Sequence, residues 1–252
     1  MTYPILEFDS APEAFIEPSK VCRPRDMPEH CVICFFRDVI DKVVDNRSAK
    51  ILVNSRWEDG PHPIYEIMHK GNRLAFYHAP VGASQSASIL EEVIAFGCRK
   101  FIACGGCGVL EKDIAAGHLI VVSSAIRDEG VSYHYLPPAR EIRANELGIS
   151  ALTKTIDKEG IPYRVGKTWT TDAPYRENPN KIAKRREEGC LVVEMEAAGM
   201  IAVAQFRNVP FGQALYGGDD LSGIEWDNRD WQSKADIRET LFWLCADACL
   251  AL

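Results

Sequence analysis

Short apolar runs alternate with amphipathic stretches along most of this chain, and the alternation predicts strands and helices in turn. Apolar residues that stand together predict buried strands at residues 31–36, 100–104, 191–193 and 211–216. Apolar residues also recur at helical spacing from Ser84, which can cap a helix, to Gly97, which can end it. This order predicts one α/β domain over residues 1–252, in three layers, with a central mixed and largely parallel sheet flanked by helices.

The remaining segments complete this plan. Strands are also predicted at 51–54, 64–69, 74–78, 118–126 and 162–167, a hairpin turn at 70–73, and helices at 37–45, 139–160, 177–188, 198–206 and 231–252. Two glycine-rich segments, 105–108 and 217–220, each follow a predicted strand and are interpreted as turns. Five prolines among residues 1–30 predict an irregular N-terminal arm that lies over the surface or reaches a partner subunit.

Composition narrows the class of partner. The chain has 46% hydrophobic residues and a formal net charge of -7. Nucleic acids and anionic membranes call for clustered positive charge, so we expect neither as a partner and expect a small molecule instead. No run approaches the ~20 apolar residues of a membrane span. The N-terminus carries acids where a secretory signal carries bases, so the cytoplasm is the expected location.

Nine cysteines are scattered through apolar runs, which in a cytoplasmic chain favours buried thiols over disulfides. Two pairs have CxxC spacing, Cys31 with Cys34 and Cys104 with Cys107. The two pairs lie too far apart for a typical zinc ribbon, and each lies at the end of a predicted strand. We therefore expect no metal site.

Two carboxylates stand where the strand 191–193 leads into the helix 198–206. Side chains two residues apart in extended backbone point the same way, so Glu194 and Glu196 would share one face, with Met195 on the other. The alternative is that both are first-turn glutamates that complement the positive end of a helix dipole.

The stretch VEMEAAG at 193–199, followed by GGDDLSG at 217–223, resembles the purine nucleoside and uridine phosphorylase family. The resemblance implies a ribose site in which Glu196 hydrogen-bonds the sugar hydroxyls beside Glu194. It also implies that Met195 packs against the sugar.

The resemblance extends over about residues 73 to 223 and implies a base site as well. Asp219, or its neighbour Asp220, is expected to protonate the leaving base, although GGDD by itself predicts only a turn. The segment GKTWTTDAPYRE resembles the loop of the family that surrounds the base, and its candidates for base contact are Trp169, Asp172 and Tyr175. Asp172 is equally well explained as a loop or helix-cap acid.

The phosphate site of the family is where this chain departs from the pattern. The family places a Gly-Asp-Pro turn after the first strand, where this chain has Phe35 and Phe36. It also places an Arg and a Ser or Thr where this chain has Ala103 and Gly106. Bulky aromatic residues deny an anion the close backbone approach that glycine allows.

Other residues are therefore candidates for the phosphate or nucleophile side. Arg56 is the first choice for a cation, because the family often uses an Arg of a neighbouring subunit there, with Arg37 and Arg127 as alternatives. Backbone amides of glycine-rich segments and one acid complete the candidate set: Gly82, Gly105, Gly106 and Asp38. Asp38 would serve as general base if water were the acceptor.

The resemblance thus implies cleavage of a nucleoside N-glycosidic bond. Phosphorolysis to free base and (deoxy)ribose 1-phosphate is preferred, with no cofactor besides inorganic phosphate as co-substrate. Hydrolysis by water is the first alternative, and nucleoside binding without turnover is the second. The resemblance also implies a homo-oligomer built from dimers, up to a hexamer.

Overall fold

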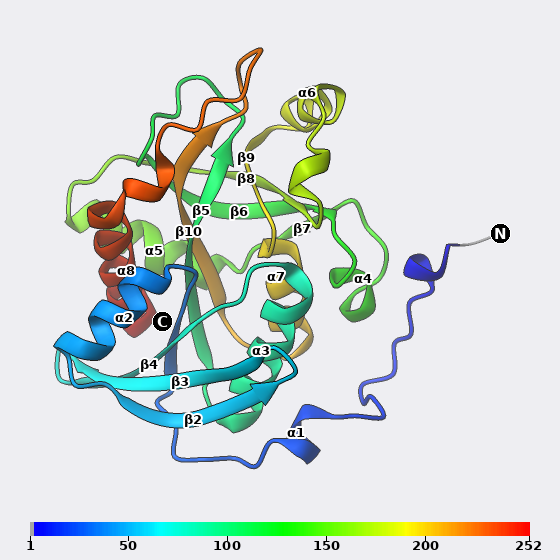
Figure 1. Cartoon of the computed structure of the whole chain (residues 1–252). Helices are drawn as coiled ribbons and strands as arrows, with labels where there is room; N and C mark the ends of the chain where they lie inside the picture. The colour runs from blue at the N-terminus through cyan, green and yellow to red at the C-terminus, as the bar shows by residue number, and fades with distance from the viewer. Residues whose placement is uncertain (1–2) are drawn as a thin grey trace.

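One sheet runs through the computed structural model, which describes residues 3–252 (Figure 1). Its strands are β1 (His30–Cys34), β2 (Lys50–Trp57), β3 (Gly60–His69), β4 (Asn72–His78), β5 (Lys100–Val109), β6 (Leu119–Asp128), β7 (Glu141–Arg143), β8 (Tyr163–Thr171), β9 (Cys190–Glu194) and β10 (Phe211–Asp220). Their order is β10-β6-β8-β9-β5-β1-β4-β3-β2, and β7 pairs with β6. The pairs β1/β4, β1/β5, β5/β10, β6/β8 and β8/β9 are parallel and the others antiparallel, so the predicted mixed sheet is confirmed.

Five strands of this sheet close on themselves. β5 pairs with β10 and with β9, and the ladders between β10 and β6, β6 and β8, and β8 and β9 complete a ring. The first half of β5, Lys100–Cys104, also pairs with β1, whereas its last two residues pair with β9. Strand β5 thus joins the ring to the flatter half of the sheet.

Helices cover both faces of the sheet (Figure 1). On one side lie α2 (Arg37–Asn46), α5 (Glu146–Lys158) and α8 (Ala235–Leu250), and on the other α3 (Ala83–Phe96), α4 (Ser132–Tyr135) and α7 (Ala197–Phe206). Each face has its own apolar core, with Ile40 and Phe242 in one and Leu90 and Met200 in the other. The predicted three-layer α/β architecture is therefore confirmed. A further helix, α6 (Pro179–Glu187), corresponds to the helix predicted at 177–188.

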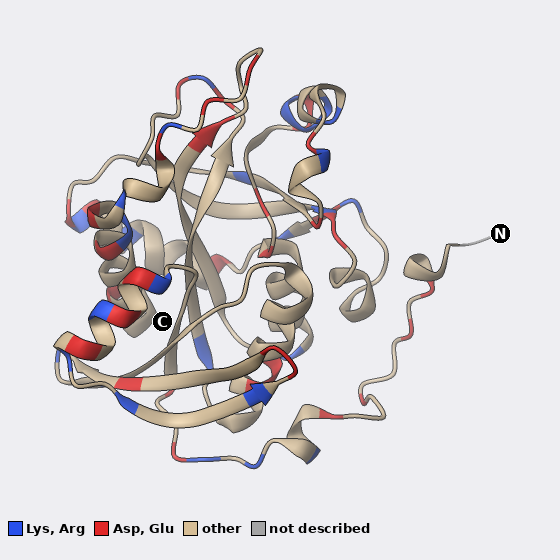
Figure 2. Cartoon of the chain, viewed as in Figure 1, with Lys and Arg blue, Asp and Glu red and all other residues tan. Residues whose placement is uncertain are grey.

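Helices α2 and α8 each carry both basic and acidic residues (Figure 2). They are joined by an ion pair between Lys42 and Glu239, whose N–O distance is 2.5 Å. A second contact between the two helices, Arg238 with Asp38, lies at the edge of the cavity described below.

Residues 3–29 contain only two short helical segments, η1 (Pro4–Leu6) and α1 (Pro18–Val21). The arm is held by the buried carboxylate of Glu17, which pairs with Arg207 at 2.8 Å. Arg207 also donates to Glu91 at 2.7 Å, so this ion-pair network ties the arm to α3 and α7.

Both glycine-rich segments differ from the expected turns, because β5 continues through the first and β10 through the second. The ladder between these strands supplies the backbone partners that a turn would otherwise provide. Aromatic rings lie directly over two of the glycines. A Cβ at Gly105 would lie 3.3 Å from the Phe35 ring, and one at Gly106 would lie 3.3 Å from the Tyr216 ring. Glycine here permits close packing of aromatic side chains rather than a change of direction.

Two helix boundaries also differ from the prediction. Gly82 is the N-cap of α3 with a φ of 101°, which glycine adopts without strain, and Ser84 lies inside the helix without capping it. The segment 139–160 is only partly helical, because β7 pairs with β6 before α5 begins. Asn145 caps α5 by accepting from the N–H of Leu147 at 2.9 Å.

All nine cysteines are buried free thiols, as expected. Among residues 3–252 no helix combines the length and apolar character needed to cross a bilayer. The same residues contain no cluster of three or more His, Cys, Asp or Glu side chains arranged to hold a metal ion.

Candidate active site

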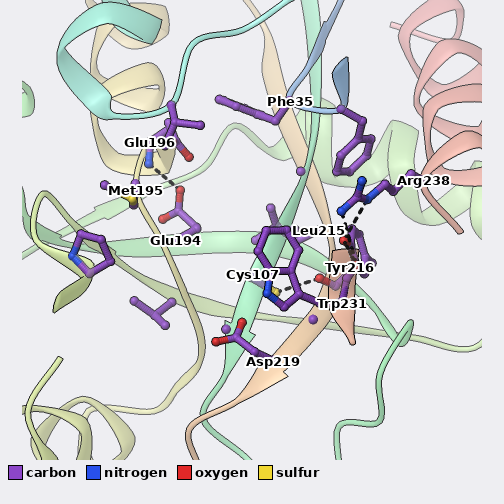
Figure 3. Close-up of a pocket in the computed structure, with 18 of the residues that line it drawn as sticks. Phe35, Cys107, Glu194, Met195, Glu196, Leu215, Tyr216, Asp219, Trp231 and Arg238 are labelled. Atoms are coloured by element: carbon purple, nitrogen blue, oxygen red, sulfur yellow. Dashed lines mark hydrogen bonds between the residues drawn. The ribbon is translucent and has the colours of Figure 1, made fainter. Parts of the chain in front are cut away.

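A cavity of about 740 Å³ opens where β1, β5, β9 and β10 approach their carboxyl ends (Figure 3). Much of its lining comes from four segments that are distant in sequence: 35–38, 105–108, 193–196 and 213–219. Figure 3 shows Glu194, Met195 and Glu196 on one side of the cavity and Tyr216 and Arg238 on the other. We call residues 194–196 the carboxylate wall. The opposite side, formed by Phe35, Phe36, Tyr216, Trp231 and Arg238, is the aromatic wall.

Glu194 is the last residue of β9 and is buried. Its Oε2 accepts from the backbone N–H groups of Glu196, at 2.7 Å, and Ala197, at 2.6 Å. Its Oε1 accepts from the hydroxyl of Thr170 at 2.6 Å. Glu194 thus satisfies N–H groups at the start of α7 and fixes the geometry of the strand-to-helix junction.

Glu196 is the N-cap residue of α7, and its Oε1 accepts from the N–H of Gly82 at 2.6 Å. Burial first, and then the nearby charge of Glu194, raise the pKa of Glu196 to about 8. Burial also raises the pKa of Glu194, but its several hydrogen-bond donors oppose that shift. The pair therefore favours a single ionised member at neutral pH, with the proton on Glu196. A protonated Glu196 can both donate and accept hydrogen bonds, which suits a pair of sugar hydroxyls.

Asp219, near the end of β10, lines the cavity, and its Oδ2 accepts from the indole N–H of Trp226 at 2.7 Å. Glu177 lines the cavity too, directly after the short helix η2 (Pro174–Arg176). Burial, and then the negative charge of Asp219, raise the pKa of Glu177 to about 7. The carboxyl group of Glu177 can therefore hold a proton near neutral pH beside Asp219, and protonation of a leaving group requires such a proton.

The aromatic wall encloses one cation. The side chain of Arg238 is only 12% exposed, and its Nε donates to the hydroxyl of Tyr216 at 3.1 Å. Its Nη2 donates to the backbone carbonyl of Trp231 at 3.3 Å. The rings of Phe36, Tyr216 and Trp231 have their centroids 5.6, 6.0 and 5.7 Å from its Cζ, so the guanidinium lies among three aromatic faces.

The candidates for the nucleophile side divide into those inside and outside the cavity. Arg37 and Asp38 line it, but Arg37 is 66% exposed and is paired with Asp41 at 2.9 Å. Arg56 is exposed on β2 and does not line the cavity of its own chain. Arg127 is buried and donates to Ser132 Oγ at 2.8 Å, so it braces the segment around α4 instead.

The candidate glycines have different surroundings. Gly105 and Gly106 line the cavity, and the rings of Phe35 and Tyr216 pack against them. Gly82 contributes its N–H to Glu196 instead.

Neither of the two aromatic candidates for base contact lines the cavity. Trp169 is completely buried, and its indole N–H donates to Asp128 at 3.0 Å. Its ring is therefore enclosed by protein and not presented to a ligand. Tyr175 is 98% exposed and points into solvent.

The two candidate acids outside the cavity have local roles. Asp172 accepts from the N–H of Gly130 at 2.9 Å, in keeping with a loop acid. Asp220 accepts from the N–H of Ser222 at 2.7 Å and pairs with Arg229. Although burial opposes them, these partners lower the pKa of Asp220. Asp220 therefore braces the loop after β10, whereas Asp219 reaches the cavity.

Comparison with known proteins now bears on this site. The sequence model of the phosphorylase superfamily matches residues 29–249. The chain belongs to this superfamily. The resemblance inferred from VEMEAAG and GGDDLSG is thereby confirmed, and it extends beyond the residues that first carried it.

Named relatives within the superfamily include nucleoside phosphorylases. The chain is 24% identical over 196 residues to a guanosine phosphorylase of Halorubrum lacusprofundi, covering 78% of this chain and 80% of the relative. It is 27% identical over 176 residues to a DeoD-type purine nucleoside phosphorylase of an Exiguobacterium species, covering 67% and 72%.

Solved structures agree with the fold. A uridine phosphorylase of Vibrio fischeri matches with a TM-score of 0.74 at 18% identity, covering 90% of this chain and 91% of the other. An AMP nucleosidase of Bacteroides thetaiotaomicron matches with a TM-score of 0.71 at 20% identity, covering 88% and 87%. At these identities the likeness establishes the superfamily fold.

Two cavity residues are missed by the sequence pattern. Glu177 is the first residue of the segment 177–188, for which the sequence pattern predicts a helix and no site residue. Arg238 lies three residues before the inward-facing Leu241, on the same face of α8, and this spacing was the available signal. An arginine on an apolar helical face is a candidate for a buried contact with a specific partner.

Proposed function

We propose that this superfamily member cleaves the N-glycosidic bond of a purine nucleoside, with inorganic phosphate as the acceptor. The observation that carries the proposal is the convergence of Glu194, Met195, Glu196 and Asp219 on one cavity of about 740 Å³, within the usual range for a small-molecule site. The names of the Halorubrum and Exiguobacterium relatives support a purine base. A role in purine salvage follows from the same proposal.

In this reaction the bond between C1′ and the base nitrogen breaks, and its electrons leave with the base. A phosphate oxygen forms the new bond to C1′, so the products are free base and (deoxy)ribose 1-phosphate. Glu196 binds the sugar hydroxyls, Met195 packs against the sugar, and Asp219 gives the base its proton, assisted by Glu177. The attacking hydrogen phosphate loses its own proton, and this proton returns Asp219 to its protonated form. Charge and protons therefore balance over the reaction.

Hydrolysis is the second candidate, because Ala103 and Gly106 stand where the family has phosphate ligands. Asp38 would then accept a proton from water as the C1′–O bond forms, and free ribose would result. The fold that this chain shares with the Bacteroides AMP nucleosidase supports keeping this candidate.

The test is base release from a panel of nucleosides, followed by chromatography, with inorganic phosphate present and then removed. Phosphorolysis predicts release that requires phosphate and yields ribose 1-phosphate. Release without phosphate, yielding free ribose, would replace it with hydrolysis. Nucleoside binding without release under either condition would support a non-catalytic binding protein.

Location in the cytoplasm and assembly into a homo-oligomer belong to the same proposal. Arg56 is exposed on its own chain, so it serves a cavity only if a second copy places it there. The loss of activity in Arg56→Ala, with oligomer mass unchanged in light scattering, would support that arrangement.

A further inference from the structure

The cavity is strongly acidic, which is an unusual setting for a reaction with an anion. Five acidic side chains line it: Asp38, Glu177, Glu194, Glu196 and Asp219. Glu196 is the protonated member of its pair. Among residues 3–252, only two cationic side chains line it, Arg37 and Arg238. A phosphoryl dianion entering this cavity therefore needs one of these arginines to offset the repulsion.

The two arginines are not equivalent. The Arg37 side chain is 66% exposed, and its Nε is committed to Asp41 one helical turn away. The Arg238 side chain is 12% exposed among three aromatic rings, where water screens its charge far less. Arg238 is therefore the stronger source of positive potential inside the cavity.

Neutral groups hold Arg238 in place. The Tyr216 hydroxyl donates to the carbonyl of Trp231 at 3.2 Å and accepts from Arg238 Nε at 3.1 Å. The Trp231 carbonyl also accepts from Arg238 Nη2. Neither contact neutralises the guanidinium, so its full charge stays available while its orientation is fixed.

The only carboxylate paired with Arg238 among the described residues is a weak competitor. Asp38 lies 3.4 Å from Nη1, longer than a good charge-assisted hydrogen bond, and its side chain is 46% exposed. Asp38 can turn outward into water at little cost. A dianion with several oxygens would then bind the Nη1 edge more strongly than Asp38 does.

We propose that Arg238 is the anion-binding residue of this cavity and that it binds a phosphoryl group. This inference rests on the proposed function and names the residue that acts on its acceptor side. The phosphoryl group is either inorganic phosphate, the nucleophile, or the 5′-phosphate of a nucleotide substrate. Asp38 acts as the counter-ion that the phosphoryl group displaces.

The test compares wild type with Arg238→Gln, Arg238→Lys, Asp38→Asn and, for the other arginine of the cavity, Arg37→Gln. Lys42→Gln is the matched control, because it removes a positive charge from the α2/α8 pair outside the cavity. Base release is measured against phosphate concentration with a nucleoside, and against a nucleoside 5′-monophosphate without phosphate. Thermal melts show that each variant is folded.

If the phosphoryl group is inorganic phosphate, Arg238→Gln raises the KM for phosphate by about 10-fold or more and leaves the KM for nucleoside nearly unchanged. Arg238→Lys restores part of the loss, and Asp38→Asn lowers the KM for phosphate. If the group is a 5′-phosphate, Arg238→Gln instead removes the preference for nucleotide over nucleoside. Equal phosphate KM and equal nucleotide preference in Arg238→Gln and wild type overturn the inference, as does a phosphate effect confined to Arg37→Gln.

A protein without catalytic activity can be distinguished from a protein in which Arg238 binds no anion. If wild type releases no base from any substrate, calorimetric titration with inorganic phosphate and with a nucleoside 5′-monophosphate tests Arg238 directly. Binding by wild type that Arg238→Gln loses would keep the anion site in a protein without turnover. The absence of any binding to wild type would overturn it. If Arg238→Gln does not fold, Asp38→Asn provides the test alone. The inference is overturned if this variant has the same KM for phosphate, or the same preference for nucleotide over nucleoside, as wild type.

Discussion

The two walls of the cavity are built in different ways. The carboxylate wall comes from one strand-to-helix junction, and Glu194 binds the backbone N–H groups of the two residues that begin α7. The aromatic wall is assembled from the β1–α2 loop, β10, η3 (Trp231–Ser233) and α8, which are far apart in sequence. The first wall keeps the family pattern and the second departs from it. The residues proposed to bind the sugar are thus encoded locally, whereas the wall that carries Arg238 depends on tertiary packing.

The largest effect is expected at Asp219, which lies between the two walls. Asp219→Asn removes the proton that the leaving base requires, so kcat/KM should fall by about 100-fold or more while the fold is kept. Steady-state base release measures it. An unchanged rate would remove Asp219 from the chemistry.

A second comparison separates the two acids of the carboxylate wall. Glu196→Ala should lower kcat/KM by about 30-fold, equivalent to about 2 kcal/mol for lost hydrogen bonds to the sugar. Glu194→Gln should instead lower the free energy of unfolding by about 2–3 kcal/mol, because an amide N–H₂ replaces an oxygen that faces two backbone N–H groups. Steady-state kinetics and urea denaturation of both variants show which substitution lowers kcat/KM and which lowers the free energy of unfolding. Equal effects of the two substitutions on stability would contradict it.

The pH dependence follows from the raised pKa of Glu177, about 7. Because the protonated carboxyl is the form that supports base protonation, kcat/KM should fall as pH rises through about 7. Glutamine does not titrate, so Glu177→Gln should lose this descending limb. A rate profile from pH 5 to 9 tests this, and an identical limb in the variant would assign it to another group.

The smallest effect is expected at Asp220. Asp220→Asn weakens the pairing with Arg229, so the free energy of unfolding should fall by about 1 kcal/mol. Its kcat/KM should stay within about twofold of wild type, since Asp220 does not line the cavity. A loss of activity as large as that of Asp219→Asn would mean that the two aspartates share the catalytic role.

The fold was readable from sequence because its signals are local. A few adjacent residues predict the strand at 31–36, the hairpin turn at 70–73 and the helix at 231–252, and the structure has β1, the turn between β3 and β4, and α8 there. The prediction of turns at the glycine-rich segments was wrong because their structure depends on residues distant in sequence. Whether Gly106 turns the chain or makes room for Tyr216 depends on a strand more than a hundred residues away.

The residues of the site also differ in whether local sequence predicts them. Glu194, Met195 and Glu196 came from a contiguous motif, and all three line the cavity. Trp169 is a plausible stacking residue from sequence because aromatic faces suit bases, but its position in β8 places the ring in the core. The spacing of Arg238 from Leu241 indicates a buried face but not its partners, because Phe36, Tyr216 and Trp231 meet around it only after the chain has folded.

The closed ring of strands has a consequence for motion. Strand β5 is paired with β1 and β10 in its first half and with β9 and β10 at its end, and only Gly105, Gly106 and Cys107 have β10 alone as a neighbour, so most of the strand has no edge from which to fray. Its amide protons should be among the slowest in the chain to exchange with deuterium. Trp231 and Arg238 stand instead on η3 and α8, outside the ring. Breathing that admits a ligand should therefore register in deuterium uptake at residues 222–238 long before it registers at β5.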